Sequence, residues 1–268
     1  MISVWLQTLK GYRTPVLLVG FGLYGFALLL AYVFQAFGGL EGLGQLVDLV
    51  PETMRALLQA QGGLATSVNG WLAGGYRHPV FLVAISAFMI GTSSRVVAGE
   101  VERGTILLLL ARPLVRWHFL LGKTGAILLG LSVILALSWA GTWTGVLIIG
   151  EAEPVDGAVL LRVMFNALAL GLAIGGYTTL VSSVSSDGGQ TTGQAAGITV
   201  GMFFIDYLAI LWAPASFLGP LSIFHYYSPA DIPDVGGTPW LDLGVLFGVA
   251  VITYAAAFIL FQRRDISR

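Results

Sequence analysis

Cysteine and charge are both scarce in this sequence. The 268-residue chain has no cysteine, which excludes disulfide bonds, thiolate metal ligands and cysteine nucleophiles. Charged residues make up 10% of the chain, whereas a soluble domain carries about a quarter. So little charge cannot cover a surface that faces water on all sides. The net charge of -1 also provides no basic field that would attract nucleic acid, so we expect no such partner.

The chain also lacks the motifs of nucleotide-binding and hydrolytic enzymes. A phosphate-binding loop requires a glycine five residues before its Gly-Lys pair, and the pair Gly122-Lys123 has Trp117 at that position. No Gly-x-Ser-x-Gly nucleophile elbow occurs in the chain. We therefore expect no catalytic residues, no bound metal and no cofactor in this chain.

Hydrophobic residues make up 56% of the chain and are gathered in long blocks. A helix of about 20 apolar residues crosses the hydrocarbon core of a bilayer. Six blocks reach about this length, which predicts an all-α integral membrane protein with six transmembrane helices in one domain. Pro15, Pro79 and Pro239 are expected to open spans, because proline in a first helical turn loses no hydrogen bond. The predicted spans cover residues 15–37, 79–97, 119–149, 158–183, 190–213 and 240–262.

The basic residues predict how these spans are oriented. Ten of the thirteen Lys and Arg residues precede the first span, lie between the second and third, or follow the sixth. The positive-inside rule then places both termini in the cytoplasm. We expect the chain to be a multi-pass protein of the plasma membrane. Two longer segments fall on the opposite side, residues 38–78 and 214–239. We expect a short amphipathic helix in the first of them, beginning at Pro51.

Charge is concentrated in residues 95–123, between the second and third predicted spans. Seven charged residues surround a short apolar run there. Thr105 is suited to cap the start of a helix over this run, and Pro113 is suited to end that helix. An ordinary solvated loop would explain the arginines, but it would not explain Glu100 and Glu102 beside an exposed apolar helix. An apolar patch rimmed by charge is typical of an interface. We therefore predict that this segment is a short cytoplasmic helix that docks on another protein.

This segment resembles the signature of type-2 ABC transporter permeases. In that family a Glu-x-x-x-Gly-Thr stretch leads into leucines, a Pro-x-x-Arg stretch and a lysine that opens the third helix. The resemblance extends over the whole chain, through the six spans and a late outer segment at residues 221–227. The matching residues read Glu100-x-Glu102-Arg103-Gly104-Thr105, a leucine run, Arg112-Pro113-x-x-Arg116 and Gly122-Lys123.

The resemblance implies the membrane-spanning subunit of a transporter, and because most of the family exports its substrates, an exporter. Two permeases, identical or different, would assemble with two copies of a separate ATPase subunit that holds ATP and magnesium. Two rivals stay open from the residues alone: a self-contained ion-coupled carrier or channel, and a membrane-embedded lipid-modifying enzyme. The ATPase-docking residues that the resemblance implies are Glu100, Glu102, Arg103, Gly104, Thr105, Arg112 and Pro113.

Two features inside the predicted spans are candidates for helix packing or for a transport pathway. The fifth span carries a glycine every four residues, which places Gly189, Gly193, Gly197 and Gly201 on one helical face. Such a face allows another helix to approach closely, either within the chain or in a second permease. Asp206 in the fifth span and Asn166 in the fourth are polar residues of a kind that often marks a pathway. A position at the membrane interface, or a simple bond between helices, would explain them equally well.

Overall fold

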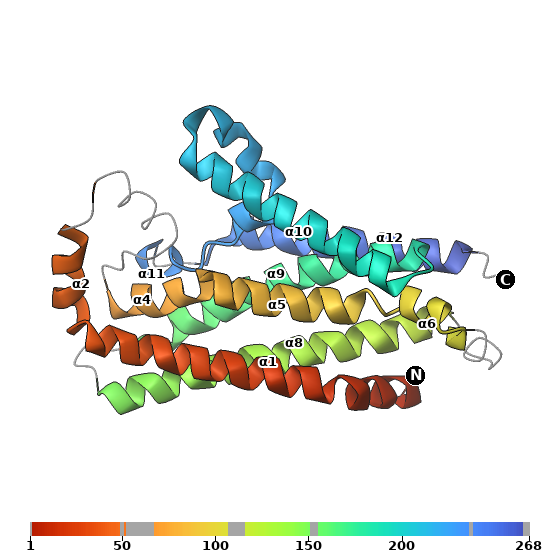
Figure 1. Cartoon of the computed structure of the whole chain (residues 1–268), viewed down its shortest axis with the longest axis horizontal. Helices are drawn as coiled ribbons and strands as arrows, with labels where there is room; N and C mark the ends of the chain where they lie inside the picture. Colours follow the sequence, from red (N-terminus) through yellow and green to blue (C-terminus); the bar gives the residue numbers. More distant parts are fainter. Residues whose placement is uncertain are drawn as a thin grey trace.

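The computed structural model describes residues 2–48, 51, 67–106, 116–150, 155–235 and 238–264. These residues form helices and connecting turns without any strand, which confirms the predicted all-α class. Five helices are long and apolar enough to cross a membrane, and one bent pair of helices adds a sixth candidate. The long helices run roughly side by side along the long axis of the molecule (Figure 1).

Helices α1 (Ile2–Ala36) and α8 (Arg116–Ile149) pack against each other along most of their length (Figure 1). In lipid the hydrophobic effect does not drive helices together, so their association depends on close packing. Glycine makes such packing possible here, because it has no side chain to keep the two backbones apart. A Cβ atom on Gly141 would lie 2.8 Å from the Cα atom of Tyr24. The two helices therefore form one closely packed pair.

Helix α9 (Gly157–Val184) is the central helix, and it packs against α5 (Pro79–Ser93), α8 and α12 (Trp240–Arg263). Its first turn is capped by Asp156, whose carboxylate accepts a hydrogen bond from the Ala158 amide at 2.8 Å. Its residues from Val159 to Ser183 are mostly buried. The core of the molecule lies around this helix.

The bent pair consists of α4 (Val68–Gly74), the 3-10 turn η1 (Gly75–Arg77) and α5, with an angle of 44° at the break. The bend falls just before Pro79, as expected, since proline disfavours helical geometry in the residue before it. The His78 side chain accepts a hydrogen bond from the Val80 amide at 3.2 Å and so begins α5. Helix α5 ends at Ser93, and the single turn α6 (Ala98–Glu102) follows it.

Helix α10 (Gly188–Leu211) is set apart from the other long helices. Its second half and the following turn η2 (Ala213–Leu221) project away from the bundle, and η3 (Ile223–Tyr226) and α11 (Ile232–Val235) lead the chain back to it (Figure 1). Both chain termini and α6 lie at one end of the bundle, which we call the termini end. Helices α2 (Gly39–Asp48), α4 and α11 lie at the other end, the loop end.

Each predicted span overlaps one helix, but the first differs from the prediction at its start. Proline was expected to open this span, whereas Pro15 lies inside α1, which begins at Ile2. The carbonyl that a proline leaves without a partner belongs to the residue four positions earlier. Here that residue is Gly11, which is exposed beside Lys10, so water can solvate its carbonyl. The amphipathic helix expected from Pro51 lies outside the described residues.

Candidate functional site

The candidate site is the region around α6, at the termini end of the bundle. This helix has no capping side chain of its own. Instead, the Ser182 hydroxyl of α9 accepts hydrogen bonds from the amides of Val97 at 3.1 Å and Ala98 at 3.0 Å, and donates one to the Ser94 carbonyl at 2.8 Å. These residues are fully buried. A side chain of α9 therefore fixes the start of α6.

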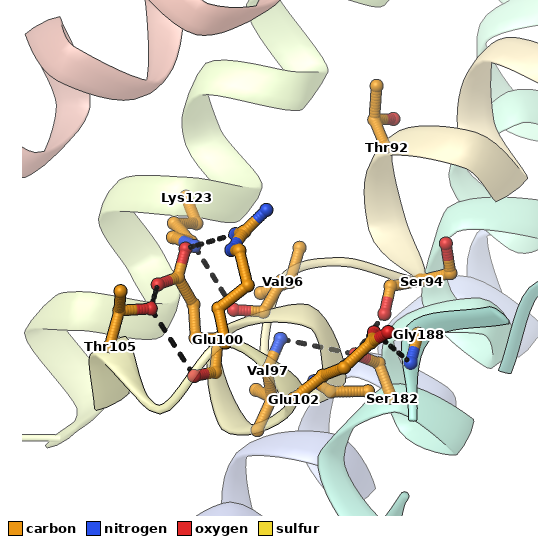
Figure 2. Close-up of polar contacts among 12 residues, drawn as sticks. Thr92, Ser94, Val96, Val97, Glu100, Glu102, Thr105, Lys123, Ser182 and Gly188 are labelled. Atoms are coloured by element: carbon orange, nitrogen blue, oxygen red, sulfur yellow. Dashed lines mark hydrogen bonds and ion pairs between the residues drawn. The ribbon is translucent and has the colours of Figure 1, made fainter. Parts of the chain in front are cut away.

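Glu100 connects α6 to α8. Its carboxylate accepts a hydrogen bond from the Lys123 ammonium at 2.6 Å, and the two side chains are only 13% and 10% exposed. Arg103 adds a bond at 3.0 Å, and the Thr105 hydroxyl donates to the same carboxylate (Figure 2). Lys123 also donates to the Val96 carbonyl at 3.3 Å. The centre of this cluster is a buried ion pair whose polar atoms have partners.

The surroundings of Glu100 favour its charged form. Burial by itself raises the pKa of a carboxyl, because it disfavours the ion. The hydrogen bonds from Lys123 and Thr105 and the charges of Lys123 and Arg103 act in the opposite direction. Together they outweigh burial, and the pKa of the Glu100 carboxyl lies below its ordinary value. Glu100 is therefore a carboxylate at neutral pH.

Glu102 connects α6 to α10. Its side chain points away from Glu100 and toward Gly188, whose amide donates to its carboxylate at 3.0 Å (Figure 2). Gly188 is the first residue of α10, where amides have no partner within the helix. The preceding Asp187 accepts a hydrogen bond from the Gln190 amide at 2.8 Å. Two carboxylates from different parts of the chain thus cap the start of α10.

Glycines allow α6 and α10 to touch. A Cβ atom on Gly188 would lie 3.1 Å from the Glu102 carboxylate and 3.4 Å from the Cα atom of Gly99. A third glycine, Gly104, follows α6 with a φ of +69°, in the left-handed region where a side chain is strained. Open space surrounds the position of a Cβ atom on Gly104. This residue therefore turns the chain at an exposed place.

The structure brings together five of the predicted docking residues and divides them by environment. All three charged residues bond within the chain, but Glu100 is largely buried, whereas Glu102 and Arg103 are exposed. Thr105 faces Glu100. Arg112 and Pro113, with the predicted helix at 106–111 apart from Ile106, lie outside the described residues. The docking role of all seven residues stays a prediction.

At the loop end, Asp206 of α10 has a partner that the sequence did not indicate. Its carboxylate pairs with the Arg77 guanidinium at 3.0 Å, and His225 lies 3.9 Å away. Arg77 also donates to the carbonyls of Phe224, at 3.4 Å, and Tyr227. Arg77 therefore joins the start of α5, the outer part of α10 and the turn η3. Its only signal in the sequence is a basic residue on the side predicted to have few.

Asn166 is buried in α9, and only one of the two polar atoms of its side chain has a hydrogen-bond partner among the described residues. Its amide nitrogen is 3.5 Å from the Tyr226 carbonyl, while its oxygen is buried and has no partner among the described residues. Asn166 and Asp206 are both buried, but they bond to different groups. The pathway role predicted for these two residues stays a prediction.

The glycines of α10 face open space in this chain. A Cβ atom on Gly193, Gly197 or Gly201 would meet nothing within 4 Å among the described residues, and one on Gly189 would meet only Asp187. In α9, by contrast, a Cβ atom on Gly171 would lie 2.6 Å from the Leu131 side chain. The glycine face of α10 is thus not used for packing within the described chain.

A groove runs between α5 and α10 beside this face. It has a volume of about 300 Å³ and an apolar lining that includes Val83, Ala87 and Val200. Toward the loop end, Phe203 and Phe224 border both this groove and a small pocket that contains Arg77 and Asp206. The groove therefore combines an apolar wall with one ion pair at its end.

Comparison with known proteins gives two matches. The model of the ABC-2 family transporter proteins matches residues 16–266. A probable ABC transporter permease protein, NosY of Pseudomonas aeruginosa, is 31% identical over an alignment 236 positions long, which covers 75% of this chain and 82% of the relative. The family match includes α6, most of α1 and the other long helices.

Proposed function

The chain belongs to the ABC-2 family of transporter proteins, and on this premise we propose that it is the membrane-spanning permease subunit of an ATP-driven exporter. A separate ATPase docks on residues 95–123 and supplies the energy. The observation that carries this proposal is the position of α6 between α8, α9 and α10, with an exposed arginine beside it. An ATPase bound there would act on three membrane helices through one short element.

The proposal includes an orientation. We place the termini end, with α6, in the cytoplasm and the loop end outside it. This agrees with the ten basic residues that flank the predicted spans on that side, because basic residues are retained on the cytoplasmic side of a membrane. It also places α6 where a cytoplasmic ATPase can reach it.

We further propose that two permeases associate through α10, as a homodimer or with a homologous partner. Only 17% of the apolar span of α10 is buried in the chain, which is slightly less than the 22% of α1 and α12 and far less than the 56% of α8 and α9. The open face carries Gly193, Gly197 and Gly201, which permit close contact with a second helix. The substrate would then pass along the groove between α5 and α10, which would lie beside the contact between the permeases.

The docking segment can be tested with two substitutions at Gly104, where the backbone strain is the same but the bulk differs. Gly104→Trp places an indole on the exposed surface beside α6, whereas Gly104→Ala adds only a methyl group in open space. The tagged protein would be purified in mild detergent and its associated proteins identified by mass spectrometry. We expect an ATPase with a phosphate-binding loop to accompany the wild-type and Gly104→Ala proteins, and to be lost with Gly104→Trp.

Two results would contradict the proposal in different ways. Equal recovery of the ATPase with Gly104→Trp would place the docking surface elsewhere on the chain. Purification of the wild-type chain without any ATPase, together with transport in liposomes that lack ATP, would favour a self-contained carrier instead. The pairing of Asp206 with Arg77 argues against that carrier, because the charge that could have bound a coupling ion already has a partner.

A further inference from the structure

We infer that Glu102 is a positioning residue that links the docking element to α10, so that a displacement of α6 moves α10. This inference rests on the proposed function, because it assumes that an ATPase acts on α6. The family resemblance placed Glu102 among the ATPase-docking residues. In the structure its carboxylate accepts a hydrogen bond from the first amide of α10 at 3.0 Å (Figure 2).

The link is strong for a single hydrogen bond. A carboxylate that accepts from a backbone amide makes a charge-assisted bond, which is stronger than one between neutral groups. A negative charge also interacts favourably with the amino end of a helix. Glu102 benefits from both effects at Gly188, which is largely buried against α6. The Glu102 side chain is exposed, but the amide that it binds belongs to a buried residue, so the bond joins α6 to α10 at a closely packed contact.

The contact also has little free space. A methyl group on Gly188 would crowd both the Glu102 carboxylate and the Cα atom of Gly99, at 3.1 and 3.4 Å. A second contact lies close by, since the Thr192 hydroxyl of α10 donates to that of Ser94, just before α6, at 2.8 Å. Closely packed backbones transmit a displacement, whereas a loose contact would absorb it.

Of the three helices that α6 contacts, α8 and α10 differ in how much of their spans is buried. On one side Glu100 fixes α6 to Lys123 of α8, a helix whose span is 56% buried. On the other side Glu102 binds α10, whose span is 17% buried. Ser182 holds the start of α6 and Glu100 its middle, so a force on α6 will rotate it about these contacts and move its last residue, Glu102, and with it α10. Because α10 borders the apolar groove, this movement changes the groove.

The test follows α10 during ATP turnover in the permease–ATPase complex. The chain has no cysteine, so a single cysteine at exposed Ile198 of α10, outside the glycine positions of the open face, can carry an environment-sensitive fluorophore. A label at Leu129 on the exposed side of α8 is the reference. In the wild-type complex we expect ATP to change the signal at Ile198 more than the signal at Leu129. In Glu102→Ala the response at Ile198 should fall to the level of the response at Leu129.

Matched controls separate a link from a simple helix cap. Asp187→Ala also removes a carboxylate from the start of α10, but it does not touch α6, so its response should stay near wild type. Gly188→Ala disturbs the contact from the other side and should reduce the response, whereas Gly189→Ala, next to it on the exposed side, should not. The amount of ATPase recovered should be the same in all four variants.

Three outcomes bear on the inference. A wild-type response in both Glu102→Ala and Gly188→Ala would overturn it. Equal loss in Glu102→Ala and Asp187→Ala would overturn it as well, because the carboxylate would then act only as a cap. If Glu102→Ala does not accumulate in the membrane, the responses of Gly188→Ala and Gly189→Ala are compared, and equal responses in these two variants would overturn the inference. Absence of any ATPase from the wild-type complex would instead reject the proposed function, before this experiment begins.

Discussion

Helices α9 and α10 are alike in sequence and different in the structure. Both are long, apolar and rich in glycine at four-residue spacing, and both begin after an aspartate cap. The span of α9 is 56% buried and its glycines lie against side chains of neighbouring helices. The span of α10 is 17% buried, and Gly193, Gly197 and Gly201 face open space, while Gly188 packs against α6.

Glycine spacing therefore shows which face of a helix allows close approach, but it does not show which other helix packs there. The same pattern serves the centre of this chain in α9 and remains free in α10. Burial distinguishes the two roles: α9 holds the bundle together, whereas α10 contacts the bundle along one side. A hydrogen bond between Tyr177 and Thr199 joins the middle of α10 to α9, and Glu102 at the termini end and Arg77 at the loop end bind it near its two ends.

The largest effect is expected where α10 is attached at the loop end. Asp206→Ala leaves the Arg77 guanidinium largely buried without a counter-ion, which costs about 3 to 5 kcal/mol of stability. Thermal unfolding of the purified protein in detergent measures this loss. The double variant Arg77→Ala/Asp206→Ala should lose less than the sum of the single variants. Strictly additive losses would mean that the pair does not hold α10.

A smaller effect is expected from filling the glycine positions of the two helices. Gly176→Leu in α9 places a side chain against the backbone of Ala250, where a Cβ atom would already lie 3.4 Å from Cα. Overpacking of this kind costs about 2 kcal/mol. Gly197→Leu in α10 should leave the unfolding temperature of the chain unchanged and reduce association of two permeases, measured by cross-linking in membranes. Equal destabilisation by both substitutions would abolish the difference between the helices.

The contact of α6 with the firmly held part of the bundle should respond to acid. A carboxyl with a lowered pKa stabilises the fold above its unfolded-state value, and this contribution disappears as the pH falls through the folded-state pKa. For Glu100 the folded pKa lies below the ordinary 4.5. Stability from this site should therefore be constant from pH 7 to pH 5 and decline only below the ordinary value.

Glu100→Gln provides the control for this acid response. It should lower stability at neutral pH by about 1.5 kcal/mol, because Lys123 loses its charged partner. It should also remove the decline at low pH, as measured by thermal unfolding across a pH series. A decline of the same size in the variant would assign the acid response to another carboxyl.

The smallest effect concerns the two aspartate caps. Asp156→Ala and Asp187→Ala each remove a capping bond worth about 1 kcal/mol. In α9 the loss should lower the unfolding temperature of the whole chain. In α10 it should mainly speed hydrogen exchange at the Gln190 amide, because the helix is only weakly coupled to the core. A fall in unfolding temperature of the same size in both variants would show that α10 is as well anchored as α9.

Hydropathy predicted the long helices well, since it is a property of residues close together in the chain. The expectation that proline opens a span was less reliable, because Pro15 lies inside α1. The Gly11 carbonyl, which Pro15 leaves without a partner in the helix, is exposed and can be solvated. Arg77 could not be assigned to Asp206, because 129 residues separate them and either charge alone fits a membrane interface. Ser182 was missed for the same reason: its role depends on α6, from another part of the chain.

The direction in which a side chain points was also beyond the sequence. Glu100 and Glu102 are two residues apart in a signature that indicates docking, and both were expected to face the partner. In the structure one bonds α8 and the other bonds α10. The sequence identified a segment that contacts α8, α9 and α10, and its docking role stays a prediction. How that segment connects to the membrane helices depends on packing, which no local pattern contains.

The open face of α10 has a consequence for the biogenesis of the protein. Besides its glycines, this face exposes the amides of Gln190 and Gln194, and polar groups are costly in lipid until another helix covers them. A newly inserted chain without a partner would therefore differ visibly from an assembled one. Proteases and chaperones of the membrane could recognise the uncovered face, remove orphan subunits and so keep permease copies in step with their partners.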